Sequence, residues 1–239
     1  MPRNTYFQFK QFRIIQEHSA MKVGVDGVLL GAWVHAEEAD RILDIGTGTG
    51  LIALMMAQKN SRAQIDALEL DPDAFREANR NFQRSGWSDR IHPELCSFQE
   101  FAERANLKYD LIVSNPPFFA NGIQVPAPNR ALARHAGSLP LAVLISGAGK
   151  LLREKGRIAL VLPVESLKEI EQPAISGNLH VSRLCRIKPN PQKPDFRILV
   201  ELTNTACSTQ EEILMIEFEK HHDYTPEYRE LTKDFYLKF

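Results

Sequence analysis

The sequence lacks the features that direct a protein into a membrane or an oxidising compartment. No apolar run approaches the roughly 20 residues that a membrane-spanning helix needs. A secretory signal has an apolar stretch after its basic residue, and no such stretch follows the basic residue near the N-terminus. The three cysteines, Cys96, Cys185 and Cys207, show no C-x-x-C spacing, which argues against a disulfide framework and against a thiolate zinc site. We therefore expect a cytoplasmic protein with reduced thiols.

An excess of charge of one sign is also absent. The 239 residues carry a formal net charge of -1 at pH 7, so only a local basic surface could hold a nucleic acid. The length suits one α/β domain with a buried sheet. The hydrophobic fraction of 44% and the charged fraction of 25% are ordinary for a soluble globular protein.

From Arg41 onward, short apolar segments alternate with longer helical patterns, which predicts a parallel sheet covered by helices on both faces. The strands expected on this basis are 41–45, 64–68, 91–95, 110–114 and 157–162. The clearest helices are 51–58, 72–84 and 139–152. Two later strands, 181–187 and 197–202, predict an antiparallel edge; a strand at 213–218 and a helix at 228–237 are weaker expectations.

A glycine-rich segment, Leu43-Asp-Ile-Gly-Thr-Gly-Thr-Gly50, lies at the end of the first expected strand. Open α/β sheets bind ligands beyond the carboxyl ends of their strands. Gly46, Gly48 and Gly50, with Thr47 between them, would let the main chain turn tightly and approach a ligand closely. The alternative is a tight turn from strand to helix with no ligand.

The nature of the ligand follows from two carboxylates. A dinucleotide-binding fold uses a related loop and an acidic residue about twenty positions on, and Glu69 fits that pattern too. However, the spacing here is G-x-G-x-G, and Asp44 directly before the loop would repel a pyrophosphate. S-adenosylmethionine is cationic, so Asp44 could orient its methionine end while Glu69 binds the ribose hydroxyls. Alternatively, Glu69 caps the helix that begins near Pro72.

A second motif, Asn115-Pro116-Pro117-Phe118, follows the strand expected at 110–114. The prolines restrict the backbone and so fix the directions of the Asn115 side chain and the Pro116 carbonyl. These two oxygens could accept both hydrogens of an exocyclic amine and leave its lone pair facing a methyl group. Phe118 offers a ring on which a flipped base could stack. An ordinary strand-ending turn is the alternative.

At these residues the chain resembles the amino-methyltransferase branch of class I S-adenosylmethionine enzymes. Phe9-Lys-Gln-Phe12 with Gln16, residues 20–33 and residues 234–237 make it similar to the tRNA1(Val) adenine-N6 methyltransferase family over essentially the whole chain. The resemblance implies an α/β, Rossmann-like, mostly parallel seven-stranded sheet. It implies S-adenosylmethionine as cofactor, without a metal, and the adenosine 3′ of the anticodon in tRNA1(Val) as substrate.

The resemblance also implies one methyltransferase domain over residues 1–239. Residues 1–40 would be a lead-in that closes the donor site, residues 41–205 the core and residues 206–239 a C-terminal extension. The sequence leaves the oligomeric state open and favours a monomer.

By resemblance, Lys22 and Asp26 lie near the donor. The residues themselves show only that Gly24 and Gly27 indicate a bent loop, with a helix-packing lead-in as the alternative. Family members commonly carry an acidic residue where Ser97 stands, so we expect weaker donor binding here. The complete expected donor set is Lys22, Asp26, Asp44, Gly46, Thr47, Gly48, Gly50, Glu69, Leu70, Ser97 and Asn115.

Basic residues form two candidate RNA-binding patches, although solvated faces explain them equally well. The first patch comprises Arg130, Arg134 and His135, and the second comprises Arg183, Arg186 and Lys188. His221 and His222 are adjacent, and adjacent side chains of a strand point in different directions. Because no further ligand clusters near them in the sequence, we expect no metal site.

Two other functions are open at this point. A protein-glutamine N5 methyltransferase solves the same chemical problem with the same motif, although only about forty residues precede the first expected strand, too few for the helical substrate domain of such enzymes. A ribosomal RNA adenine would be a further substrate for the same chemistry. A catalytically silent module that binds the donor or RNA is the alternative of a different class, and the intact Asn115-Pro116-Pro117 motif argues against it.

Overall fold

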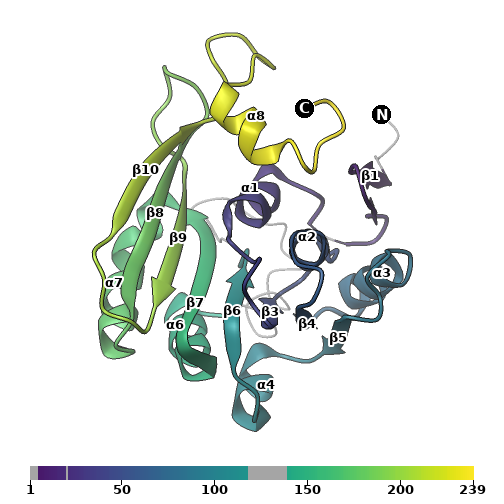
Figure 1. Ribbon diagram of the computed structural model, residues 1–239, viewed down its shortest axis with the longest axis vertical. Helices are drawn as coiled ribbons and strands as arrows, with labels where there is room; N and C mark the ends of the chain where they lie inside the picture. The colour runs from purple at the N-terminus through teal and green to yellow at the C-terminus, as the bar shows by residue number, and fades with distance from the viewer. Residues whose placement is uncertain (1–4, 20, 118–138) are drawn as a thin grey trace, which may run out of the picture.

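The computed structural model describes residues 5–19, 21–117 and 139–239. An eight-stranded sheet crosses the molecule in the order β10-β8-β9-β7-β6-β3-β4-β5, and a two-stranded sheet holds the N-terminal segment (Figure 1). The strands are β1 (Tyr6–Gln8), β2 (Arg13–Ile15), β3 (Arg41–Ile45), β4 (Gln64–Glu69), β5 (Ile91–Leu95), β6 (Tyr109–Ser114), β7 (Leu152–Pro163), β8 (His180–Lys188), β9 (Arg197–Thr203) and β10 (Gln210–Met215).

Most of the large sheet is parallel. The neighbours β5, β4, β3, β6 and β7 all pair in parallel, since the chain crosses over between consecutive strands. β9 lies between β7 and β8 and pairs antiparallel with both. The antiparallel pairing expected for the late strands is therefore confirmed.

The large sheet has one strand more than the seven expected. The additional strand is β10, which pairs in parallel with β8 at the edge. It begins three residues earlier than the predicted strand 213–218, because its first half, Gln210-Glu-Glu212, is polar and exposed and carries no apolar signal. Polar and charged side chains are common on edge strands, because they hinder pairing of the exposed edge with other chains.

Helices cover both faces of the large sheet (Figure 1). Consecutive residues of one strand join different apolar clusters: Ile42 packs with α1, α2 and α3, whereas Leu43 packs with α4, α6 and α7, as the two-residue period of a strand requires. Among the described residues, no helix is long and apolar enough to cross a membrane. The helices are α1 (Val25–Trp33), α2 (Leu51–Lys59), α3 (Pro72–Gln83), α4 (Phe98–Arg104), α6 (Leu141–Leu151), the 3-10 turn η1 (Val164–Ser166), α7 (Leu167–Ser176) and α8 (Pro226–Thr232).

The helices expected at 51–58, 72–84 and 139–152 are confirmed as α2, α3 and α6, whereas the expectation of a bent loop around Gly24 and Gly27 is wrong. Gly27 lies inside α1, which begins at Val25. A Cβ atom on Gly31 would lie 2.5 Å from the Met55 sulfur, and one on Gly27 would lie 3.0 Å from Leu51 Cδ2. These glycines therefore allow α1 to pack closely on α2 and do not bend the chain.

The N-terminal hairpin β1–β2 and the C-terminal segment contact each other (Figure 1). The amide of Lys10 donates to the Phe235 carbonyl at 2.9 Å, and its side chain donates to the carbonyl of Phe239 at 2.7 Å. Phe9 stacks on Tyr236 with ring centroids 6.0 Å apart. The C-terminal segment thus holds the N-terminal hairpin β1–β2 in place.

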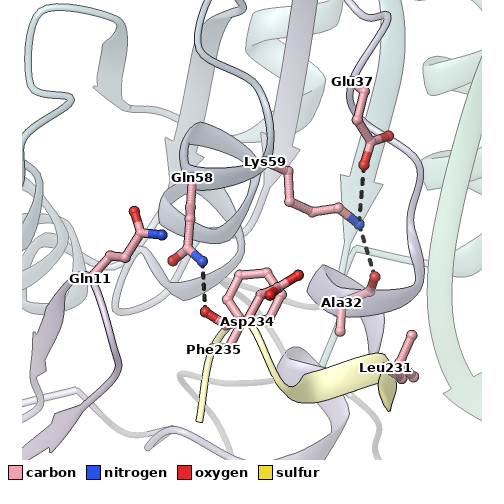
Figure 2. A pocket seen from close by; sticks show the side chains of 8 residues that line it. All are labelled: Gln11, Ala32, Glu37, Gln58, Lys59, Leu231, Asp234 and Phe235. Atoms are coloured by element: carbon pink, nitrogen blue, oxygen red, sulfur yellow. Dashed lines mark hydrogen bonds and ion pairs between the residues drawn. The ribbon is translucent and has the colours of Figure 1, made fainter. Parts of the chain in front are cut away.

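A cavity of about 410 Å³ lies at the C-terminal ends of α1 and α2, far along both helices from the glycine-rich loop. Figure 2 shows the side chains that line it. Lys59 lies at its wall with 15% of its side chain exposed and forms a 4.0 Å ion pair with Glu37. Its ammonium donates to the carbonyl of Ala32 at 2.8 Å and to that of Val34. Burial lowers the pKa of Lys59, and Glu37 opposes that shift. Lys59 therefore satisfies carbonyl groups at the end of α1 that have no partner within the helix.

We predict that Lys59→Met destabilises the protein by about 1–3 kcal/mol, because it leaves the Ala32 and Val34 carbonyls without their donor while keeping the apolar stem. Urea unfolding followed by circular dichroism measures the loss. The exposed Lys168 on α7 provides the matched control, and Lys168→Met should leave the midpoint unchanged. Equal midpoints for both variants would show that the Lys59 hydrogen bonds do not stabilise α1.

Candidate active site

The predicted site residues follow the carboxyl ends of neighbouring parallel strands. β3 lies between β6 and β4, and β5 lies beyond β4. The Ser114 hydroxyl donates to the Ile45 carbonyl at 2.7 Å, which ties the end of β6 to the end of β3. The glycine-rich loop, Glu69, Ser97 and the Asn115 motif consequently share one edge of the sheet.

The glycine-rich loop needs its glycines for two different reasons. Gly46, Gly48 and Gly50 have φ values of 72°, 58° and 85°, a region that residues with a side chain rarely adopt. A Cβ atom on Gly50 would also lie 2.5 Å from the Phe82 ring, whereas one on Gly46 or Gly48 would meet nothing within 4 Å among the described residues. The first two glycines therefore face open space where a ligand could approach the main chain.

Asp44 is completely buried beneath this loop. Its Oδ2 accepts hydrogen bonds from the Thr47 hydroxyl at 2.6 Å and from the Ala53 amide at 3.1 Å. Burial, with a smaller contribution from Glu69, raises the pKa of Asp44 to about 7, although the hydrogen bonds from Thr47 and Ala53 oppose the shift. Its Oδ1 is buried without a hydrogen-bond partner in the described residues. A cationic ligand would supply what this oxygen lacks.

Glu69 organises the loop and does not cap the next helix. Its Oε2 accepts from the Gly48 amide at 2.8 Å, and its Oε1 accepts from the amides of Leu70 at 2.8 Å and Asp71 at 2.9 Å. Asp71 is the residue that caps α3. Leu70 exposes 43% of its surface next to Glu69, so an apolar side chain and a carboxylate lie together at the end of β4.

Ser97 is the N-cap of α4 and forms a capping box with Glu100. Its hydroxyl donates to Glu100 Oε2 at 2.7 Å and accepts from the Glu100 amide at 3.1 Å. The hydroxyl is thus already engaged by its own helix, and its role toward a donor stays a prediction.

The Asn115 motif is described as far as Pro117, and Phe118 lies outside the described residues. Pro116 is buried and Pro117 is exposed. The Oδ1 atom of Asn115 is buried and has no hydrogen-bond partner within the described ranges. Its Nδ2 atom lies 3.8 Å from the position of a Cβ on Gly27, so α1 passes directly beside the motif.

The two donor residues expected in the lead-in have partners within the protein. Lys22 donates to the Gln16 carbonyl at 3.2 Å. Asp26, in the first turn of α1, forms an ion pair with Arg197 in which Nε and Oδ2 are 2.9 Å apart. The sequence does not reveal Arg197 as a site residue, because its partner Asp26 lies 171 positions away and no local motif links them.

The second candidate RNA patch is not one surface, and the first lies outside the described residues. Arg183 faces the α1 side of the sheet, with its guanidinium 4.0 Å from the centre of the Trp33 ring. Arg186 comes three residues after Arg183 in β8, so its side chain lies on the opposite face, where it pairs with Asp195 at 4.0 Å. Strand alternation therefore separates the two arginines. Arg130, Arg134 and His135 of the first patch are among the residues left undescribed.

The expectation of no metal site assumed that His221 and His222 lie on a strand and point in different directions. They do not lie on a strand. They lie in the turn after β10, and their rings stack with centroids 3.8 Å apart. Glu217, four residues before His221, joins them, and the three side chains bring their ligand atoms within 4.8 Å of one another. The spacing Glu-x-x-x-His-His is visible in the sequence. The positive φ of 67° at His222, which accompanies the stacking of the two rings, could not be predicted from it.

Comparisons with known proteins identify the family. The methyltransferase small domain family matches residues 18–170. The tRNA1(Val) (adenine(37)-N6)-methyltransferase of Trichodesmium erythraeum is 47% identical, with 98% of each chain covered. The protein of that name from Parabacteroides distasonis is 45% identical, with 98% of this chain and 99% of that one covered.

Solved structures that are similar support the fold. A predicted O-methyltransferase from Agrobacterium tumefaciens has a TM-score of 0.67 at 19% identity and covers 88% of this chain and 96% of that one. Aeropyrum pernix fibrillarin with natively bound S-adenosyl-L-methionine has a TM-score of 0.50 at 18% identity and covers 74% and 72%. At these identities the likeness concerns the fold alone.

We predict that S-adenosylmethionine binds more tightly as the pH rises from about 5.5 to 7, by roughly tenfold in affinity, because Asp44 must lose its proton to attract a cation. The amino group of the ligand stays protonated over this range. Isothermal titration calorimetry at three pH values measures the trend. Asp44→Asn should bind weakly with a flat profile, and a wild-type profile equally flat would remove Asp44 from the donor site.

Proposed function

Because the chain belongs to the family of the methyltransferase small domain and of the tRNA1(Val) (adenine(37)-N6)-methyltransferases, we propose that it transfers a methyl group from S-adenosylmethionine to N6 of an adenine in tRNA. The observation that carries this proposal is a pair of buried oxygens without partners among the described residues, Asp44 Oδ1 and Asn115 Oδ1. Asp44 lies in β3, and Asn115 directly follows the neighbouring strand β6. Buried acceptors of this kind are satisfied by ligands in a working site.

Each oxygen suits one reactant. Asp44 Oδ1 would accept from the ammonium of the donor, while Glu69 and the exposed Leu70 would flank its ribose and adenine. Asn115 Oδ1 and the Pro116 carbonyl would accept the two hydrogens of the adenine amine. The amine would then present its lone pair to the sulfonium methyl, which would transfer in line to nitrogen with release of S-adenosylhomocysteine, and the nitrogen would lose one of its hydrogens as a proton. The transfer itself needs no metal.

The finer proposal is that the acceptor is adenosine 37 of tRNA1(Val), next to the anticodon. The relatives that cover nearly the whole chain carry this substrate in their names. An unpaired loop base is one that a protein can extract and stack. We also propose that the enzyme acts as a monomer in the cytoplasm, since the substrate in the names of its relatives is tRNA.

We further propose that the lead-in, residues 1–40, closes the donor site within a single domain. Its helix α1 packs on α2, which begins at the glycine-rich loop, and passes beside Asn115. The core over 41–205 would then supply the loop and the motif, and the C-terminal extension over 206–239 would hold the lead-in through contacts such as Lys10 with Phe239.

Methyl transfer from labelled S-adenosylmethionine into unmodified tRNA1(Val) tests the proposal, with nucleoside mass spectrometry to locate the label. We expect one N6-methyladenosine per tRNA at position 37, and none in a transcript with guanosine at that position. Parallel reactions contain ribosomal RNA and a release-factor protein. Label in the protein would move the acceptor to a glutamine amide, and label in no substrate would indicate a silent binding module.

We predict that Asn115→Ala lowers the rate constant of methyl transfer by at least about a hundredfold, because it removes the acceptor that directs the amine, while the dissociation constant of the donor changes little. Single-turnover kinetics and calorimetry separate the two quantities. Asn106→Ala, at an exposed position after α4, is the matched control and should behave as wild type. A variant at Asn115 with undiminished turnover would contradict the assigned role.

A further inference from the structure

Outside the methyl-transfer site, the turn of residues 217–224 gathers three side chains able to ligate a metal. Glu217 Oε2 lies 3.2 Å from Nδ1 of His221, and Glu217 Oε1 lies 4.0 Å from Nδ1 of His222. The turn joins β10 to α8, both marked in Figure 1. We propose that this turn binds one zinc ion through Glu217, His221 and His222.

The backbone of the turn is ordered before any ion binds. The Glu217 amide donates to the Pro189 carbonyl at 3.0 Å, and Glu217 forms a β-bridge with Tyr224. Within the turn, the Phe218 amide donates to the Asp223 carbonyl at 2.8 Å. The left-handed conformation of His222, with φ of 67°, brings its ring back over His221. The backbone therefore needs little reorganisation, which favours binding, whereas the two stacked rings must rotate until both lone pairs face one ion.

The donor set is the one that zinc prefers. Zinc binds imidazole nitrogen at about 2.0–2.1 Å and carboxylate oxygen at about 2.0–2.2 Å, so the ligand atoms of a tetrahedral site lie about 3.3–3.5 Å apart. The Glu217–His221 pair already has this separation, and His222 must approach by roughly half an ångström. The Tyr224 hydroxyl lies 3.0 Å from this same Nδ1 atom of His222, so zinc would displace that hydrogen bond. Water would complete the fourth position.

The charge and exposure of the turn also fit a dication. Besides Glu217, the turn carries the carboxylates of Glu219 and Asp223 against the single cation Lys220, so a positive ion is attracted to it. His221 and His222 expose 78% and 69% of their side chains, whereas Glu217 exposes 18%. The ion can thus enter from solvent and be held by an anchored carboxylate. It would fasten the connection between the edge strand β10 and α8.

Competition with a chromophoric zinc chelator, on the full chain freed of metal, tests the site. We expect one equivalent of zinc with a dissociation constant in the micromolar range or below. Cobalt in place of zinc should give the visible absorption bands of a tetrahedral ion with nitrogen and oxygen ligands. His221→Ala and His222→Ala should each weaken zinc binding at least about tenfold. His92→Ala and Cys207→Ser, which change other exposed potential ligands, should bind as wild type.

Thermal unfolding with and without zinc gives a second readout. Zinc should raise the melting temperature of the wild type and of both control variants, since a ligand that binds only the folded state stabilises it, but not that of the His221 or His222 variant. Equal melting temperatures of all variants without zinc would show that the substitutions leave the fold intact. If wild type binds no zinc, or if the histidine variants bind it as tightly as wild type, the site does not exist; loss in the control variants would reveal an adventitious ion only.

Discussion

The burial of the Asp44 carboxyl group at the end of β3 is the constraint on which the site depends. A carboxylate removed from water is costly unless hydrogen bonds or a cation compensate it. The ligand-free protein supplies two hydrogen bonds, both to Oδ2, from Thr47 and Ala53. Burial therefore raises the pKa of Asp44, and a bound cationic donor would favour the charged form. Three glycines with positive φ keep Thr47 and the start of α2 in the positions that this balance requires.

The direction of the strands brings the two halves of the chemistry together. Because β3 and β6 are parallel neighbours in register, with Ile45 opposite Ser114, the residues that follow both strands emerge at the same edge. Asn115 is thus placed beside the donor loop although the two motifs are far apart in the sequence. The same argument places Glu69 and Ser97 on the other side of the loop, since β4 and β5 continue the parallel series. One topological rule thus accounts for the positions of the glycine-rich loop, Glu69, Ser97 and the Asn115 motif.

The sequence predicted what local patterns encode and missed what distant contacts decide. A short apolar segment that is buried on both faces predicts a strand, and 41–45 was predicted with the bounds that the structure has. The bounds of 91–95 were also predicted, although β5 is an edge strand in which only Ile91 is buried. The edge strand β10 was displaced by three residues because its first half is polar. Gly27 was taken for a bend because a glycine can indicate either a flexible backbone or close packing of helices. Only its contact with Leu51, which the folded structure shows, identifies close packing. Arg197 and Glu217 owe their importance to folded neighbours, which no local spacing reveals.

The ion pair between Asp26 and Arg197 links the donor and acceptor sides of the site. Asp26 belongs to α1, whose next residue, Gly27, adjoins both Leu51 at the start of α2 and Asn115 after β6. Arg197 begins β9, the strand that pairs with β7 beyond β6. The pair therefore joins the lead-in to the part of the sheet that continues past the acceptor motif. Asp26 retains a buried Oδ1 without a partner in the described part of the chain, so a donor ligand could complete its hydrogen bonding while Arg197 keeps α1 in contact with the sheet. Donor binding and the position of Asn115 would then depend on the same helix.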